Sequence, residues 1–198
     1  MAADQSPRFN LDKARVLIFD GDAMSTDIMA RILRGFGARN IDKATGTDDA
    51  KRFVNQGQYD LIVVDPAMAG ADGYDFIPWL RRSAAGDNRF APVLIVTSHT
   101  QASRIAAARD SGANIVIGKP LTPVAIIERI IWMAREKRPH VDCKVYAGPD
   151  RRFKFDGPPP GSEGRRDQDL TSKVGSASEP NMSQGDIDAL MQPRKVTL

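Results

Sequence analysis

The stretch LIVVDPAMAGADGYDFIPWL, residues 61–80, decides the fold. Four apolar residues run directly into Asp65, and a proline and a glycine-containing turn follow before an amphipathic segment begins. A short, continuous run of Leu, Ile and Val is typical of a strand that is buried on both faces. We therefore predict a buried strand that carries a carboxylate at its carboxyl end and is followed by a turn and a helix.

The same alternation of strand and helix runs through the first two thirds of the chain. Apolar runs predict five strands, at residues 15–20, 40–44, 61–65, 92–98 and 114–118. Helical periodicity predicts helices at residues 24–34, 47–55, 72–82 and 101–110, and a last helix that opens with Thr122 and Pro123. Parallel strands need such crossovers, so the predicted fold class is α/β, a five-stranded parallel, doubly wound sandwich.

The composition limits the function classes. A net charge of +3 in 198 residues is small for a general nucleic-acid binder. Cys143 is the only cysteine, which excludes an intramolecular disulfide and favours a reducing compartment. The sequence has no leader pattern and no apolar run of about 18 residues, so we expect a cytoplasmic protein that does not contact a membrane.

The composition also changes along the chain. We predict an N-terminal arm at residues 1–12, one globular domain at residues 13–137 and a tail at residues 138–198. The tail is rich in Gly, Pro and charged residues and poor in apolar ones, so we expect it to be largely disordered. It has no helix-turn-helix pattern, and we therefore expect no DNA-binding output domain.

Polar residues gather where the predicted strands end. Asp20, Asp65 and Thr97 end the first, third and fourth strands, and Lys119 follows the fifth. The carboxyl ends of parallel strands meet at one edge of a sheet, where α/β proteins place their ligand crevice. Two acids, a hydroxyl and an amine at that edge suggest phosphate chemistry.

Four motifs in this order resemble bacterial two-component response regulator receiver domains: LIFDGDAM, VVDPAMAGADG, VLIVTS and VIGKPLTP, within residues 15–136. The resemblance implies a flavodoxin-like, CheY-like fold and a signalling protein that is not an enzyme. It implies that Asp65 attacks a phosphoryl group supplied by a sensor histidine kinase or phosphotransfer protein. The output would be protein-protein interaction.

The resemblance also assigns roles to the neighbours of Asp65. Asp20, together with Asp65 and the backbone carbonyl of Ala67, would hold Mg²⁺. Lys119 would pair with a phosphoryl oxygen, toward which the Thr97 hydroxyl would move. The Lys119–Pro120 bond would be cis.

This sequence departs from the family pattern at one acid. The family usually has two adjacent acids after the first strand, and here Gly21 stands in the place of the second. The departure predicts weaker Mg²⁺ binding unless Asp22 reaches the metal through the flexible glycine. A pseudo-receiver scaffold, in which Asp65 and Lys119 form a static ion pair, is therefore an alternative.

Two arginine pairs lie in the predicted tail, within residues 146–169: Arg151 with Arg152, and Arg165 with Arg166. Guanidinium groups bind phosphates in a bidentate manner and stack on bases, and Tyr146 adds another flat surface. The segment resembles the arginine-rich tails of CheY-like cyclic di-GMP effectors. A cyclic di-GMP-responsive adaptor, for example in motility, is thus a second interpretation, and a solvated linker is the simpler one.

The segment at residues 182–192 predicts a short helix. Ser183 and Asp186 form a variant of the capping box, and the apolar residues Ile187, Leu190 and Met191 share one face. The segment resembles the N-terminal receiver-binding peptide of the flagellar switch protein. The likeness implies docking on this receiver or on another one, at the face of the fourth helix, fifth strand and fifth helix. Autoinhibition relieved at Asp65 is the corresponding hypothesis.

Overall fold

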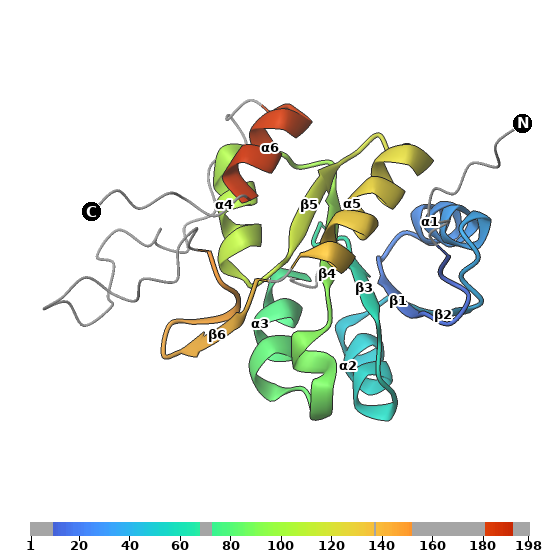
Figure 1. Cartoon of the computed structure of the whole chain (residues 1–198), viewed down its shortest axis with the longest axis horizontal. Coiled ribbons are helices and arrows are strands. Elements are labelled where there is room, and N and C mark those ends of the chain that lie inside the picture. Colours follow the sequence, from blue (N-terminus) through green and yellow to red (C-terminus); the bar gives the residue numbers. More distant parts are fainter. Residues whose placement is uncertain (1–9, 68–72, 137, 152–180, 192–198) are drawn as a thin grey trace, which may run out of the picture.

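The structure is a computed structural model that describes residues 10–67, 73–136, 138–151 and 181–191. Its centre is a five-stranded parallel sheet with the order β2-β1-β3-β4-β5, which confirms the predicted fold class (Figure 1). The strands are β1 (Arg15–Phe19), β2 (Asn40–Ala44), β3 (Leu61–Val64), β4 (Val93–Thr97) and β5 (Ile115–Gly118).

Helices cover both faces of this sheet. They are α1 (Ala23–Gly35), α2 (Thr47–Gln56), α3 (Gly73–Ser83), α4 (Ala102–Asp110) and α5 (Pro123–Arg135), with a 3-10 turn, η1 (Gly86–Phe90), before β4. Two of the starts follow from local chemistry. The Asp22 carboxylate caps α1, and the Thr122 hydroxyl caps α5 with Pro123 in the first turn.

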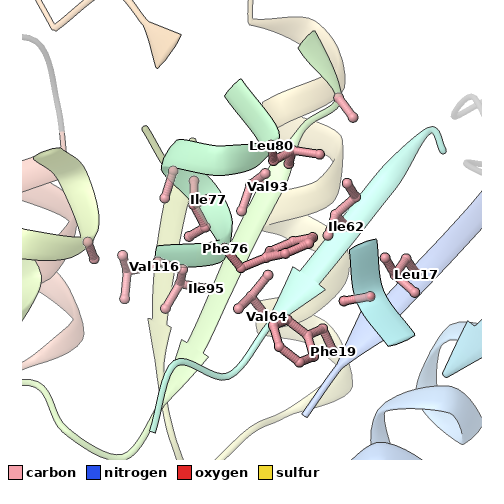
Figure 2. Close-up of a cluster of buried hydrophobic side chains, with 14 of the residues drawn as sticks. Leu17, Phe19, Ile62, Val64, Phe76, Ile77, Leu80, Val93, Ile95 and Val116 are labelled. Atoms are coloured by element: carbon pink, nitrogen blue, oxygen red, sulfur yellow. The ribbon is translucent and has the colours of Figure 1, made fainter. Parts of the chain in front are cut away.

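Two apolar layers hold the sandwich together. Side chains alternate along each strand, so Ile62 and Val64 of β3 face one layer while Leu61 and Val63 face the other. The first layer packs against α2, α3 and α4, and Figure 2 shows Phe76 of α3 lying across it. The second layer packs against α1 and α5. Burial on both faces explains why the strand sequences are continuous apolar runs.

The register of the strands fixes the functional edge. Phe19 of β1 is paired with Val64 of β3, and Thr97 of β4 is paired with Gly118 of β5. The residue after each of three strand ends is polar: Asp20, Asp65 and Lys119. The parallel pairing therefore delivers these side chains to the same edge of the sheet.

The beginning of the predicted tail needs a correction. Residues that we expected to be disordered form an antiparallel hairpin of β6 (His140–Cys143) and β7 (Tyr146–Pro149). Tyr146 is buried, and the Arg82 guanidinium of α3 donates to the Lys144 carbonyl at 3.2 Å. Gly112 and Gly148 let two backbones approach closely, because both have positive φ and a Cβ at Gly112 would lie 2.6 Å from the Ala147 carbonyl oxygen. This long-range packing leaves little local sequence pattern.

The last described element is α6 (Gln184–Met191), which lies in the predicted segment. The Ser183 hydroxyl accepts from the Asp186 amide at 3.3 Å and lies 2.7 Å from its carboxylate. In Figure 1 this red helix lies beside α4 and β5, which corresponds to docking on the chain's own receiver face. Across the described parts of the chain, no helix has the length and apolar character to cross a membrane.

Candidate functional site

Two carboxylates and one amine meet at the edge of the sheet. Asp20 and Asp65 are both 8% exposed. The Lys119 ammonium donates to Asp65 Oδ2 at 2.7 Å and lies 3.7 Å from Asp20 Oδ2. A charge pair with this little exposure is stable only if hydrogen bonds satisfy its remaining atoms.

Backbone amides and one hydroxyl provide those hydrogen bonds. The Ala67 amide donates to Asp65 Oδ1, and the Asp22 amide donates to Asp20 Oδ1, both at 2.8 Å. The Lys119 ammonium also donates to the Ser25 hydroxyl at 2.8 Å. Each carboxylate thus has one oxygen fixed by its own loop and a second oxygen directed toward the shared space. Sequence analysis missed Ser25, whose only signal is its place in the first turn after the acidic loop.

Thr97 is the fourth predicted residue at this edge. Its side chain is buried, and its hydroxyl accepts from the His99 amide at 3.1 Å. The hydroxyl therefore contacts its own loop in this conformation. The peptide bond between Lys119 and Pro120 is cis, as the resemblance implies.

The metal-binding potential of the site rests on oxygen atoms. Asp20 and Asp65 offer carboxylate oxygens, which suit Mg²⁺, an ion that usually keeps several of its waters. Asp20 and Asp65 therefore fit such an ion, and the Ala67 carbonyl stays a predicted third ligand. Within the described ranges, no cluster of three or more Asp, Glu, His or Cys side chains could hold a metal, so the site has one acid fewer than a three-carboxylate site.

Asp22 is used differently in this conformation. Its carboxylate accepts from the Met24 amide at 3.2 Å and from the Ser25 amide at 3.1 Å, as the N-cap of α1. To reach a metal it would have to release both amides, and losing a cap costs roughly 1 kcal/mol. The structure therefore does not bring Asp22 into the group of Asp20 and Asp65.

The predicted cyclic di-GMP residues are only partly described. The Arg151 guanidinium stacks over the Tyr146 ring at 4.2 Å and forms an ion pair with Asp110. Burial raises the pKa of Tyr146 to about 12, and its hydroxyl donates to the Pro149 carbonyl. Arg152, Arg165 and Arg166 lie outside the described residues. Cyclic di-GMP binding stays a prediction, and one face of Tyr146 is already covered by Arg151.

Comparison with known proteins agrees with this geometry. Residues 16–131 match the response regulator receiver domain family. Chemotaxis protein CheY-3 of Vibrio cholerae is 28% identical over 116 residues, which cover 59% of this chain and 88% of that protein. Transcriptional regulatory protein YvrH of Bacillus subtilis is 28% identical over 120 residues, 61% of this chain and 48% of that protein. The chain thus matches about half the length of YvrH.

Solved structures share the fold. CheY4 of Vibrio cholerae superimposes with a TM-score of 0.55 at 21% identity, covering 60% of this chain and 97% of that one. A putative response regulator from Chloroflexus aurantiacus gives 0.57 at 24% identity, covering 62% and 98%. Both likenesses concern the receiver sandwich. The chain belongs to the response regulator receiver family, and its receiver domain is homologous to CheY and to other two-component response regulators.

Proposed function

We propose that this protein accepts a phosphoryl group on Asp65 from a sensor histidine kinase or a phosphotransfer protein, and signals through protein-protein interaction. One observation carries the proposal. The Asp65 carboxylate lies at the sheet edge with Oδ1 held by the Ala67 amide and Oδ2 held 2.7 Å from the Lys119 ammonium. An oriented carboxylate beside a cation suits an attack on an anionic phosphoryl group.

The reaction is an in-line transfer. An Asp65 carboxylate oxygen forms a bond to phosphorus while the bond from phosphorus to the donor histidine nitrogen breaks, and that nitrogen keeps the electron pair. Lys119 then pairs with a phosphoryl oxygen instead of the carboxylate. Thr97 ends β4, the strand next to the one that carries Asp65. Its hydroxyl turns away from the His99 amide and donates to another phosphoryl oxygen.

Mg²⁺ would be held by Asp20, Asp65 and the Ala67 carbonyl. When bound it neutralises part of the phosphoryl charge. A structure with 19% identity and a TM-score of 0.56, that of the CheX-CheY complex of Borrelia burgdorferi, contains beryllofluoride and Mg²⁺. Gly21 removes one acid from this chain, so we propose weaker Mg²⁺ affinity than a site with both acids would have.

Intact mass spectrometry tests the proposal. The full chain is incubated with a small acyl phosphate donor and Mg²⁺, beside the variants Asp65→Asn and Asp75→Asn. Asp75 is an exposed acid on α3 and serves as the matched control. We expect one added phosphoryl group on the wild type and on Asp75→Asn, and none on Asp65→Asn. An unmodified wild type would favour the pseudo-receiver alternative.

A further inference from the structure

The C-terminal helix α6 occupies a defined face of the receiver, formed by α4, β5 and α5, which we term the docking face. Ile187 is fully buried and Met191 is 4% exposed. Both join the apolar layer that contains Ile105 of α4 and Val116 of β5. An eight-residue helix is marginal alone in water, so this burial accounts for its formation.

Polar contacts make the docking specific. β5 is an edge strand of the sheet, with free backbone groups on its outer side. The Gln184 amide satisfies two of them, because its oxygen accepts from the Gly118 amide at 2.9 Å and its nitrogen donates to the Val116 carbonyl at 3.0 Å. Asp188 forms an ion pair with Arg129 of α5. The helix thus contacts each element of the face through different chemistry.

Two segments contact α6 and also carry residues of the phosphoryl site: the loop after β4 and the end of β5. The Met182 amide donates to the Thr100 carbonyl at 2.8 Å, and the Thr100 hydroxyl donates back to the Met182 carbonyl at 3.2 Å. Thr100 lies in the loop that begins at Thr97, whose hydroxyl accepts from the His99 amide. On the other side, Gly118 directly precedes Lys119. Movement of Thr97 or Lys119 therefore acts on anchors of α6.

We propose that residues 181–191 are an intramolecular ligand that closes the docking face, and that phosphorylation at Asp65 weakens this contact and releases the helix. The inference rests on the proposed function. Weakening of the α6 contact, rather than strengthening, is expected because of Thr97. When the Thr97 hydroxyl turns to a phosphoryl group, it leaves the His99 amide, and the loop that contains Thr100 loses this hydrogen bond.

Competition in trans tests the docking. The full chain is titrated with a fluorescent peptide of residues 181–191. An attached ligand acts at an effective concentration on the order of mM, so the wild type should bind the peptide weakly. Ile187→Asp in the chain should release α6 and lower the peptide Kd at least tenfold. Ala189→Asp adds the same charge on the exposed side of α6 and should leave the Kd at the wild-type value.

A charge swap provides a second route to the same conclusion. Asp188→Arg places two cations together and should open the face as Ile187→Asp does. Adding Arg129→Asp to that variant restores the pair with its signs exchanged and should close the face again, which slower amide exchange along α6 reports, because Arg129→Asp by itself would repel Asp188 of the peptide. Equal peptide affinity for the wild type, Ile187→Asp and Asp188→Arg would overturn the proposal.

Hydrogen exchange tests the coupling to Asp65. Amide exchange at Met182 and along α6 is followed before and after treatment with the phosphodonor, and intact mass is recorded on the same sample. We expect at least tenfold faster exchange in the phosphorylated protein and no change in Asp65→Asn. Absence of the added mass would count against the proposed function. Added mass with unchanged or slower exchange would overturn this inference and leave the proposed function intact.

Discussion

Restoring the missing acid is the most informative perturbation of the site. Gly21 lies beside Asp20 and its backbone is outside the left-handed region, so an aspartate fits there without backbone strain. Gly21→Asp would give the site a third carboxylate, next to Asp20 and Asp65. We expect the variant to bind Mg²⁺ more tightly and to be less stable without it.

The magnitude follows from the charges. With an effective dielectric of about 20, a carboxylate about 2.1 Å from Mg²⁺ gains about 16 kcal/mol. Repulsion of about 4 kcal/mol from each of two carboxylates at about 4 Å is present with and without the ion, so it lowers the stability of the metal-free variant and leaves the gain in affinity unchanged. Desolvation costs several kcal/mol for each ion. The remaining gain is about 1.4 to 2.8 kcal/mol, which is roughly ten- to a hundredfold in Kd.

Titration calorimetry with MgCl₂ measures this change on the full chain. Asp22→Asn is the matched control, because asparagine also caps helices well and should preserve the start of α1. We expect its Mg²⁺ Kd to stay within about twofold of the wild type. An unchanged Kd in Gly21→Asp would refute the assignment of the metal to this edge. A large loss in Asp22→Asn would show that Asp22 leaves its cap and binds the ion.

Three further predictions concern stability and the tail. Arg81 is 2% exposed, and its guanidinium donates to four acceptors: the carbonyls of Gly112, Arg89 and Ala91 and the Asn114 side chain. Burial lowers the pKa of Arg81 to about 10, so the guanidinium stays charged at neutral pH. Arg81→Met leaves these acceptors without a donor and should lower the free energy of unfolding in urea by about 2 to 4 kcal/mol, whereas Arg82→Met, on the exposed neighbour, should cost less than about 1 kcal/mol. Burial, and then the nearby Arg81, lowers the pKa of His140 from its usual 6.5 to about 4. The unfolded chain therefore binds more protons than the folded one between pH 6.5 and pH 4. The contribution of His140 to the free energy of unfolding should be complete above pH 6.5 and fall toward pH 4 by about 1 to 2 kcal/mol, after allowance for partial exposure. Thermal melts at several pH values should show this loss of stability in the wild type and not in His140→Phe, and an equal loss in both would contradict the assignment. If residues 146–169 bind cyclic di-GMP, calorimetry on the full chain should give heat that the double variant Arg165→Ala, Arg166→Ala loses, and heat that survives in this variant would exclude that arginine pair.

Much of the fold was predictable because its signals are local. Val, Ile and Leu runs mark strands buried on both faces, and the polar residue that follows each run marks the functional edge. Asp65 and Lys119 were therefore placed together from strand ends alone, as the 2.7 Å contact between them shows. Parallel topology converts a position in the sequence into a position in space, and this conversion does not depend on side-chain detail.

The missed features depend on contacts between distant residues. Ser25 reaches Lys119 across the sheet edge, and Gln184 reaches Gly118 from a segment 66 residues away. The β6–β7 hairpin contains few apolar residues and is held by Tyr146 and by the close approach of Gly112. Neither a hydrophobic period nor a turn signal encodes such partners, so sequence analysis assigned residues 138–151 to a disordered tail.

The most direct test of the account locates the phosphoryl group on the chain. The protein is treated with phosphodonor and Mg²⁺, the acyl phosphate is reduced with borohydride, and the peptide that contains residues 61–80 is sequenced by tandem mass spectrometry. The account predicts that the reduced residue is Asp65, that its yield falls when EDTA removes the metal, and that Asp75 is unmodified. Modification at another acid, or none at Asp65 with Mg²⁺ present, would contradict the central claim.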